Sequence, residues 1–143
     1  MGLFDAIDTA ASGLSAERMR MDVTAENLAN AQTTRGADGQ PYRRKVVMLE
    51  QSGASFVGTL GGAMNRGAAG VRVAGIADDA TPNRLVYDPG HPDADARGYV
   101  SMPNVQPVTE MVDLISASRA YEANVTVMQT AKQMFAKTLE LLR

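Results

Sequence analysis

The segment from Pro107 to Leu142, PVTEMVDLISASRAYEANVTVMQTAKQMFAKTLELL, decides the fold. Apolar residues recur through it at alternating steps of three and four. They occupy eight of ten positions on that series, against about four or five expected from the 45% hydrophobic content of the chain. The spacing predicts one continuous amphipathic helix of about 50 Å. The ten positions are Met111, Leu114, Ser118, Tyr121, Val125, Met128, Lys132, Phe135, Leu139 and Leu142.

The start of this segment carries two further signals. Pro107 suits the first helical position, where its missing N–H needs no partner, and Glu110 lies near the positive end of the helix dipole. A second apolar stripe, formed by Val108, Val112 and Ile115, lies off the main series. The helix is therefore expected to be covered on more than one side.

A second helix is predicted from Leu3 to about Asn30, with a length of about 40 Å. One heptad position there is apolar throughout, whereas the other is only half apolar, which suits a helix with several neighbours better than a two-stranded coiled coil. Gly13 interrupts this helix, either as a tolerated defect or as a point where another helix approaches closely. The apolar position holds Ile7, Leu14, Met21 and Leu28, and the mixed one Leu3, Ala10, Glu17 and Thr24.

If the two helices packed only on each other, their extra apolar stripes would stay in contact with water. Burying each Leu, Val or Met is worth about 1.5–3 kcal/mol, and the chain offers no third long helix to cover them. The remaining cover is therefore expected from other subunits. This favours an assembly subunit over an enzyme or a monomeric adaptor.

The middle of the chain is predicted to be rich in β-strands. Short segments rich in Val, Tyr and Arg alternate there with Gly, Pro and Asp, and residues 52–70 form a glycine-rich, flexible loop. The predicted fold class is α+β, mainly α: a helix over 1–31, a β-rich segment over 32–103 and a helix over 104–143, with the two helices packed as a coiled-coil-like pair that forms one assembly domain. The predicted strands are Tyr42 to Leu49, Val71 to Ala77, Arg84 to Tyr87 and Gly98 to Met102.

Bulk composition excludes several classes of function. The chain has 143 residues and no cysteine, so neither a disulfide framework nor a thiolate site is expected. A net charge of −2 gives no basis for nucleic-acid binding, and the one basic cluster, Arg43 to Lys45, is interpreted as the polar start of a strand. No stretch is long and apolar enough to cross a bilayer, and the first residues lack the features of a cleaved secretory signal.

The best candidate for chemistry is the run from Val86 to Asp95, VYDPGHPDAD, which gathers three carboxylates and the only histidine, His91. It lacks the glycine and the distant glutamate of a calcium loop, and its prolines place the carboxylates in turns. We expect these aspartates to cap backbone N–H groups. No catalytic residue, metal or cofactor is predicted.

Two segments carry a family resemblance. Val23 to Ala31, VTAENLANA, resembles the A-x-N-L-A-N-x signature near the start of bacterial flagellar rod and hook proteins, although Glu26 replaces the more usual Asn. Glu110 to Asn124, EMVDLISASRAYEAN, is similar to the C-terminal helix of the same axial family. The loop from Gly36 to Pro41 and the run from Val86 to Val105 narrow the resemblance to the proximal rod proteins.

The resemblance implies a structural subunit of the periplasmic, torque-transmitting rod, exported by the flagellar type III apparatus without a cleaved signal. The alternative is another axial protein of the distal rod or hook type. The implied partners are copies of the chain, rod proteins of the FlgB, FlgF, FlgG and FliE types, and the export apparatus. The expected assembly interface comprises Leu3, Ile7, Leu14, Met21, Asn27, Leu28, Asn30, Met111, Leu114, Tyr121, Val125, Met128, Phe135, Leu139 and Leu142, with Asn27 and Asn30 as the motif asparagines.

Overall fold

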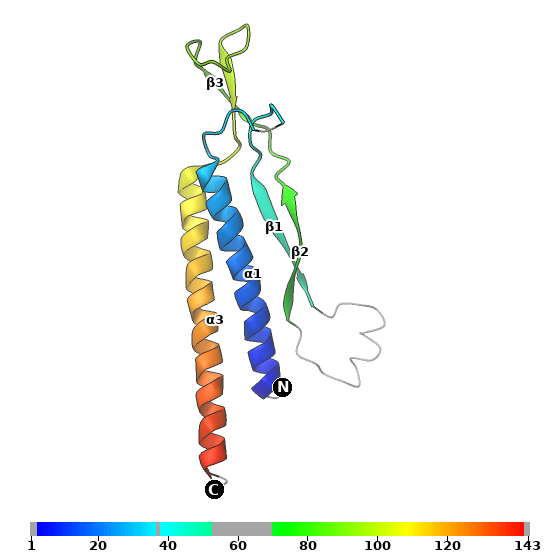
Figure 1. Ribbon diagram of the computed structural model, residues 1–143, viewed down its shortest axis with the longest axis vertical. Coiled ribbons are helices and arrows are strands. Elements are labelled where there is room, and N and C mark those ends of the chain that lie inside the picture. Colours follow the sequence, from blue (N-terminus) through cyan, green and yellow to red (C-terminus); the bar gives the residue numbers. More distant parts are fainter. Residues whose placement is uncertain (1–2, 37, 53–69, 142–143) are drawn as a thin grey trace, which may run out of the picture.

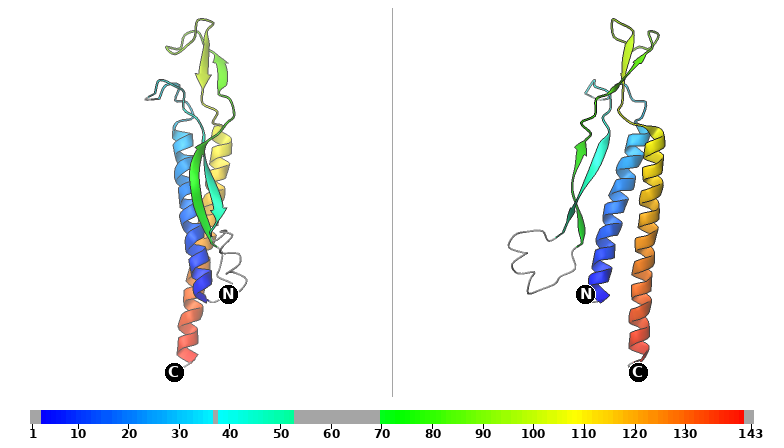
Figure 2. Two further views of the ribbon diagram at one scale, coloured as in Figure 1. Left: turned by 90° about the vertical axis from the view of Figure 1, so that its right-hand side faces the viewer. Right: turned by 180° about the vertical axis from the view of Figure 1, so that it is seen from behind.

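The computed structural model describes residues 3–36, 38–52 and 70–141, which form an elongated molecule (Figure 1). Two long helices lie side by side, one β-hairpin runs along the first helix, and a second hairpin projects beyond the end of the helix pair (Figures 1 and 2). The elements are α1 (Leu3–Ala29), β1 (Lys45–Gln51), β2 (Val71–Asp78), β3 (Arg84–Tyr87), β4 (Tyr99–Met102) and α3 (Pro107–Leu141). The predicted fold class, mainly α with a small β-rich middle, is confirmed.

The helices run antiparallel and pack against each other. Asn27 near the end of α1 contacts Glu110 in the first turn of α3, and Gly13 lies against Asn124. These two contacts are fourteen residues apart on either helix, from 13 to 27 and from 110 to 124. Because α3 has 35 residues and α1 has 27, the last turns of α3 extend past the start of α1 (Figure 2).

Small residues dominate the buried part of the helix pair. Ala10, Ala16, Ala117 and Ala131 are each at most 5% exposed. A Cβ atom on Gly13 would lie 3.0 Å from the side-chain nitrogen of Asn124. The close-approach interpretation of Gly13 is therefore the one that the structure supports, because a larger residue would push against α3.

The two hairpins confirm the predicted strands, with ends shifted by three residues at most. Strands β1 and β2 pair antiparallel, with an irregularity between Met48 and Leu49, and β3 pairs antiparallel with β4. Both strands of the first hairpin contact α1. The predicted loop at 52–70 lies, from residue 53 to 69, outside the described residues.

Local hydrogen bonds fix the helix ends that face the hairpins. The Asn30 side chain donates to the Glu26 carbonyl at 2.9 Å and accepts from the Thr33 hydroxyl at 3.1 Å, so it closes the last turn of α1. At the start of α3, Pro107 is the first helical residue, as predicted, and the Glu110 N–H donates to the Gln106 carbonyl at 3.0 Å. Both ends are therefore built from short-range contacts.

The core is thin. The largest fully buried side chains in the described ranges are Glu110, Val100, Asn27 and Pro103, two of which are polar. Within the same ranges, neither helix combines the length and the apolar character that crossing a membrane requires. Much of the stabilisation at the hairpin end of the helices must therefore come from hydrogen bonds and ion pairs.

Candidate assembly surfaces and the junction that orients them

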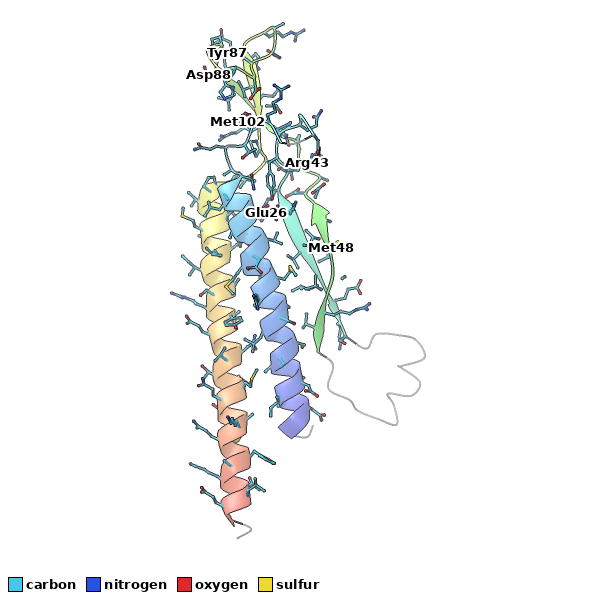
Figure 3. All side chains as sticks on the ribbon, in the orientation of Figure 1. Glu26, Arg43, Met48, Tyr87, Asp88 and Met102 are labelled. Atoms are coloured by element: carbon cyan, nitrogen blue, oxygen red, sulfur yellow. The ribbon has the colours of Figure 1, made fainter. Side chains whose placement is uncertain are left out.

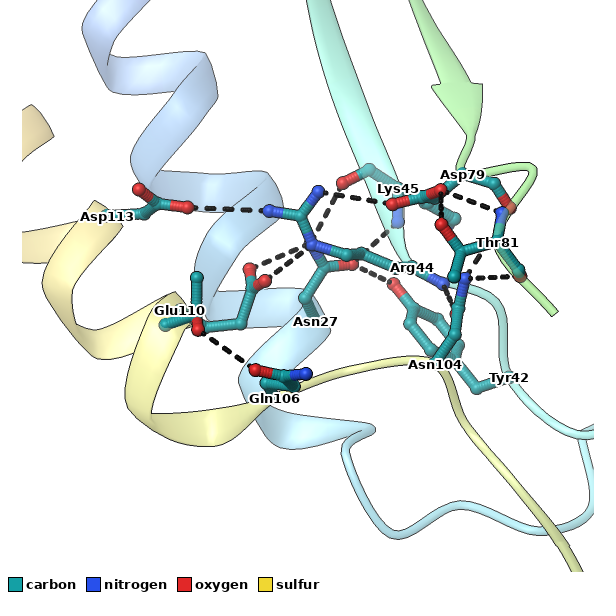
Figure 4. A network of polar contacts seen from close by, with 11 residues as sticks. Asn27, Tyr42, Arg44, Lys45, Asp79, Thr81, Asn104, Gln106, Glu110 and Asp113 are labelled. Carbon is teal, nitrogen blue, oxygen red and sulfur yellow. Dashed lines mark hydrogen bonds and ion pairs between the residues drawn. The ribbon is translucent and has the colours of Figure 1, made fainter. Parts of the chain in front are cut away.

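A cluster of polar side chains joins the end of α1, the start of β1, the end of β2 and the first turn of α3 (Figure 4). We call this cluster the junction. Asn27, Arg44 and Glu110 are at its centre, and each comes from a different segment of the chain. The other members are Tyr42, Lys45, Asp79, Thr81, Asn104 and Asp113.

Asn27 is 1% exposed and uses both ends of its amide. Its nitrogen donates to the Lys45 carbonyl at 2.8 Å and to a Glu110 carboxylate oxygen at 3.1 Å. Its oxygen accepts from the Lys45 N–H at 2.8 Å and from the Tyr42 hydroxyl at 3.0 Å. The side chain therefore pairs with the backbone of Lys45 as a neighbouring strand would, and holds the start of β1 against α1.

Arg44 binds three carboxylates from two segments, Glu110 and Asp113 of α3 and Asp79 at the end of β2. Its Nε donates to Glu110 at 2.6 Å, and its two terminal nitrogens lie 3.5 Å from Asp79 and 3.4 Å from Asp113. The hydrogen bond that the guanidinium donates to Glu110 raises the pKa of Arg44 above its ordinary value, in spite of partial burial. Glu110 is 1% exposed, and both Arg44 and Asn27 donate hydrogen bonds to its buried carboxylate.

The end of β2 is held by Asn104 and Asp79. Asn104 accepts from the Arg44 N–H at 2.7 Å and donates to the Thr81 carbonyl at 3.0 Å. Asp79 accepts from the hydroxyl of Thr81 at 2.6 Å and from its N–H at 2.9 Å. These two bonds, with the nearby Arg44 charge, lower the pKa of the Asp79 carboxyl below its ordinary value.

Glu26 of α1 lies at the edge of the junction, next to its members Lys45 and Tyr42. The Lys45 ammonium donates to Glu26 at 2.6 Å, and this bond raises the pKa of Lys45. Desolvation of the Tyr42 phenol and the nearby Glu26 charge raise the pKa of Tyr42. Glu26, the residue that departs from the family signature, thus ties α1 to β1 at the protein surface.

The arrangement suits a mechanical joint rather than a reaction centre. The carboxylates of Glu110 and Asp79 are bound by hydrogen-bond donors from the protein itself. The adjacent cavity measures about 120 Å³ and is open to solvent, between α1 and the start of β1. In the described ranges, no three potential metal-ligating side chains come together. The junction fixes the angle between the first hairpin and the helix pair.

The turn around His91 also uses its polar groups locally. Asp88 accepts from the Gly90 N–H at 3.2 Å, and Asp95 accepts from the N–H groups of Arg97 at 2.8 Å and Tyr99 at 2.9 Å. The capping role predicted for these two aspartates is confirmed. Asp93 differs, because it accepts from the Thr34 hydroxyl at 2.8 Å and so ties this hairpin to the loop after α1.

The side chains predicted for the assembly interface on α1 lie at the border of the helix pair. Ile7, Leu14, Met21 and Leu28 are half-buried, while Ala10 and Val23 between them are buried. Asn30 is half-buried and caps the helix, whereas Asn27 is fully engaged in the junction. The side chain of Leu3 lies outside the described part of the chain.

The predicted residues of α3 divide into two groups. Leu114, Tyr121, Val125 and Met128 are half-buried beside α1. Met111, Phe135 and Leu139 are 45%, 41% and 53% exposed, and Leu142 lies outside the described part. The second stripe is more exposed still, at 70% for Val108, 60% for Val112 and 54% for Ile115. The structure thus leaves apolar surface of α3 in contact with solvent.

Sequence reasoning did not identify most of the junction. The sequence pattern indicates Arg44 only as part of the polar start of a strand, and Glu110 only as a favourable charge near a helix terminus. Asn27 was predicted, but as an interface residue and not as a partner of Lys45 and Glu110. One signal for these residues was available in the sequence. Asn27 lies in the first segment that carries the family resemblance, and Glu110 lies in the second.

Comparison with known proteins places these features in one family. The family described as "Flagella basal body rod protein" matches residues 7–37, and that described as "Flagellar basal body rod FlgEFG protein C-terminal" matches residues 96–141. The first match covers most of α1 and its capping turn, and the second covers β4 and α3.

Full-length relatives narrow the assignment. Flagellar basal-body rod protein FlgC of Bacillus subtilis is 48% identical, over 99% of both chains. The FlgC proteins of Escherichia coli O6:H1 and Borreliella burgdorferi are 48% and 46% identical, over at least 98% of each chain. These matches favour a proximal over a distal rod or hook type. The chain belongs to the FlgC family of flagellar basal-body rod proteins and is a structural subunit of the rod.

Proposed function

We propose that the chain polymerises through its terminal helices, joining copies of itself and other rod proteins into a shaft that crosses the periplasm and transmits torque. The observation that carries this proposal is the apolar surface of α3. Val108, Val112, Met134 and Leu139 are each between 52% and 70% exposed, over most of the length of the helix. Covering half of such a side chain contributes about 1 kcal/mol, so several shared contacts add up to a stable lattice.

The proposed partners beyond copies of the chain are rod proteins of the FlgB, FlgF, FlgG and FliE types and the type III export apparatus, with export not requiring a cleaved signal. The family supports the basal body as the location and other rod proteins as the class of partner. The junction supports the mechanical part of the proposal, because its hydrogen bonds join the first hairpin to both helices.

The proposal is tested by placing a charge on the helices at half-buried positions. Leu14→Asp and Val125→Asp should abolish swimming while the protein is still expressed and exported, because a carboxylate at the border of the helix pair opposes burial against a neighbour. Gln129→Asp, at an exposed position four residues after Val125, is the control and should leave motility unchanged. Normal swimming of both Leu14→Asp and Val125→Asp would refute assembly through these faces.

A further inference from the structure

The molecule carries an exposed apolar patch on each of two opposite sides. The first is the stripe of Val108, Val112 and Ile115 on α3. Ala117, which is fully buried, marks the side of α3 that faces α1. At 100° per residue, the three stripe residues point within about 40° of the opposite direction. We call this patch the α3 stripe.

The second patch is on the outer face of the first hairpin. Lys45 reaches Glu26 on α1 and Val47 is half-buried, so alternation along β1 turns Val46 and Met48 away from the helix. Val46 is 37% exposed, and Met48, labelled in Figure 3, is 50% exposed. We call this patch the hairpin face.

The order of the layers places the two patches far apart. α3 packs on α1, α1 packs on the hairpin, and neither β1 nor β2 packs on α3 (Figure 1). Both patches lie at the end of the helix pair nearest the junction, because α3 and β1 start there and run in the same direction (Figure 1). Copies placed side by side therefore bring the α3 stripe of one against the hairpin face of the next.

The charges beyond each patch are complementary. On α3, the exposed Arg119 and Glu122 follow the stripe. On the hairpin, Glu50 follows Val46 and Met48 and pairs with Arg72 at 2.9 Å, with both side chains more than half exposed. The charges begin about 10 Å beyond Val112 on the helix and about 13 Å beyond Val46 on the strand. If Val112 of one copy is placed beside Val46 of the next, Arg119 faces Glu50 and Glu122 faces Arg72.

We propose that the α3 stripe of one copy binds the hairpin face of a second copy of this chain, in a head-to-tail contact. The inference rests on the proposed role as a polymerising rod subunit and names the copy-to-copy contact within it. Two different patches on one chain make a heterologous contact, which generates a ring or a helix and not a closed pair. Such a contact is the kind that a rod needs.

Cross-linking tests this contact directly, because the chain contains no cysteine of its own. Met48→Cys and Val112→Cys are made singly, and assembled rods are treated with a short bis-maleimide. Cells that express both single variants should yield cross-linked dimers of this chain, and cells with either variant alone should yield none. The matched control is Met48→Cys with Val127→Cys, whose residue is 50% exposed but lies outside the stripe, and it should give no dimer.

Charge reversal gives a second, independent test. Two double variants are made, Glu50→Arg with Arg72→Glu on the hairpin and Arg119→Glu with Glu122→Arg on α3. Each variant keeps one positive and one negative charge beside its own patch but exchanges their positions relative to the other patch. Either double variant should lower the cross-linked yield about fivefold, because like charges then face each other across the contact. The two reversals combined should restore the yield.

Three results would overturn the inference: no mixed dimer in rods that contain both variants, dimers from Val112→Cys alone, or a cross-link from Val112→Cys only to a different rod protein. Each of these three results is compatible with rod assembly through the terminal helices. That proposed function is tested separately, by the motility of Leu14→Asp and Val125→Asp. Failure of the copy-to-copy contact is thus distinguishable from failure of the proposed function.

Discussion

Asn27 and Asn30 are three residues apart in one motif but have different environments. Asn27 is buried and binds three residues of two other segments, whereas Asn30 is half-buried and binds only its own helix end. On the side of β1 that faces α1, the Asn27 side chain binds the Lys45 backbone in place of a neighbouring strand. Its loss leaves donors and acceptors of the buried backbone without partners.

We expect Asn27→Ala to lower the free energy of unfolding by about 3 kcal/mol, because several buried hydrogen bonds are lost together. Asn30→Ala should cost only about 1 kcal/mol, which is typical of a lost local cap. Urea unfolding followed by far-UV circular dichroism measures both. Equal effects of the two substitutions would contradict the role assigned to Asn27.

Asp79 makes stability depend on pH in the acid range. Its pKa is lower in the folded protein than the ordinary value of 3.8, so it contributes stability that is complete well above that value. That contribution is lost as the pH falls from about 4 through the lowered pKa. Asp79→Asn should therefore show a smaller loss of stability than the parent chain between about pH 5 and pH 2.

Thr81→Val provides the matching control for Asp79. It removes the hydroxyl that donates to the carboxylate at 2.6 Å but leaves the backbone N–H at 2.9 Å. The pH dependence of unfolding should then fall between those of the parent chain and Asp79→Asn. A Thr81→Val variant whose acid unfolding matches that of the parent would show that this hydroxyl is not the main cause of the lowered pKa.

At the scale of single residues, the sequence predicted local roles but not long-range partners. It identified Pro107 as a helix start and Asp88 and Asp95 as caps, since these depend on neighbours in the chain. The pairing of Arg44 with Glu110 spans 66 residues, and nothing local distinguishes this arginine from Arg43 beside it. Burial of Glu110 follows from how three elements meet, which one sequence does not reveal.

At the scale of elements, strands and helices were easier to predict than the packing between helices. Short segments rich in Val, Tyr and Arg, bounded by Gly, Pro and Asp, placed all four strands within three residues of their observed ends, because strand and turn preferences are local properties. The heptad series emphasised large residues such as Leu14 and Met21, which are half-buried. Alanines occupy the buried positions, since they let the helix backbones approach closely.

Gly13 provides a test of that close approach. Gly13→Ala should change the free energy of unfolding little, because a gain of about 1 kcal/mol in helix propensity is offset by crowding against the Asn124 amide, 3.0 Å away. In an Asn124→Ala background the same substitution should stabilise the protein by about 1 kcal/mol. A double-mutant cycle in urea measures the difference. Additive effects would mean that the two helices do not meet at Gly13.

At the scale of the whole molecule, the chain combines a tightly hydrogen-bonded junction with apolar surfaces that its own elements leave exposed. The junction holds the first hairpin against the helix pair through Asn27, Arg44 and Glu110. Elsewhere the apolar surface is left in contact with water, most clearly along α3. The junction thus sets the relative positions of these faces, and in the proposed rod the neighbouring subunits would cover them.

Substitutions near the end of α3 can distinguish the stability of one subunit from the stability of the assembly. Ten residues before Gly13 lies Leu3, and ten residues after Asn124 lies Met134, so the antiparallel register places the start of α1 level with Met134. Leu139 lies beyond that point and is 53% exposed, whereas Ala131 lies within the pair and is 2% exposed. Both positions are in the last third of one helix.

Leu139→Lys should change the free energy of unfolding of the purified subunit by less than about 0.5 kcal/mol, because the side chain is already solvated and a cation suits a helix C-terminus. It should nevertheless prevent rod assembly, since the charge would have to be buried against a neighbour. Ala131→Lys should instead lower the stability of the subunit itself by about 3 kcal/mol. Urea unfolding and swimming motility together separate the two cases, and a motile Leu139→Lys strain would show that the end of α3 stays exposed in the finished rod.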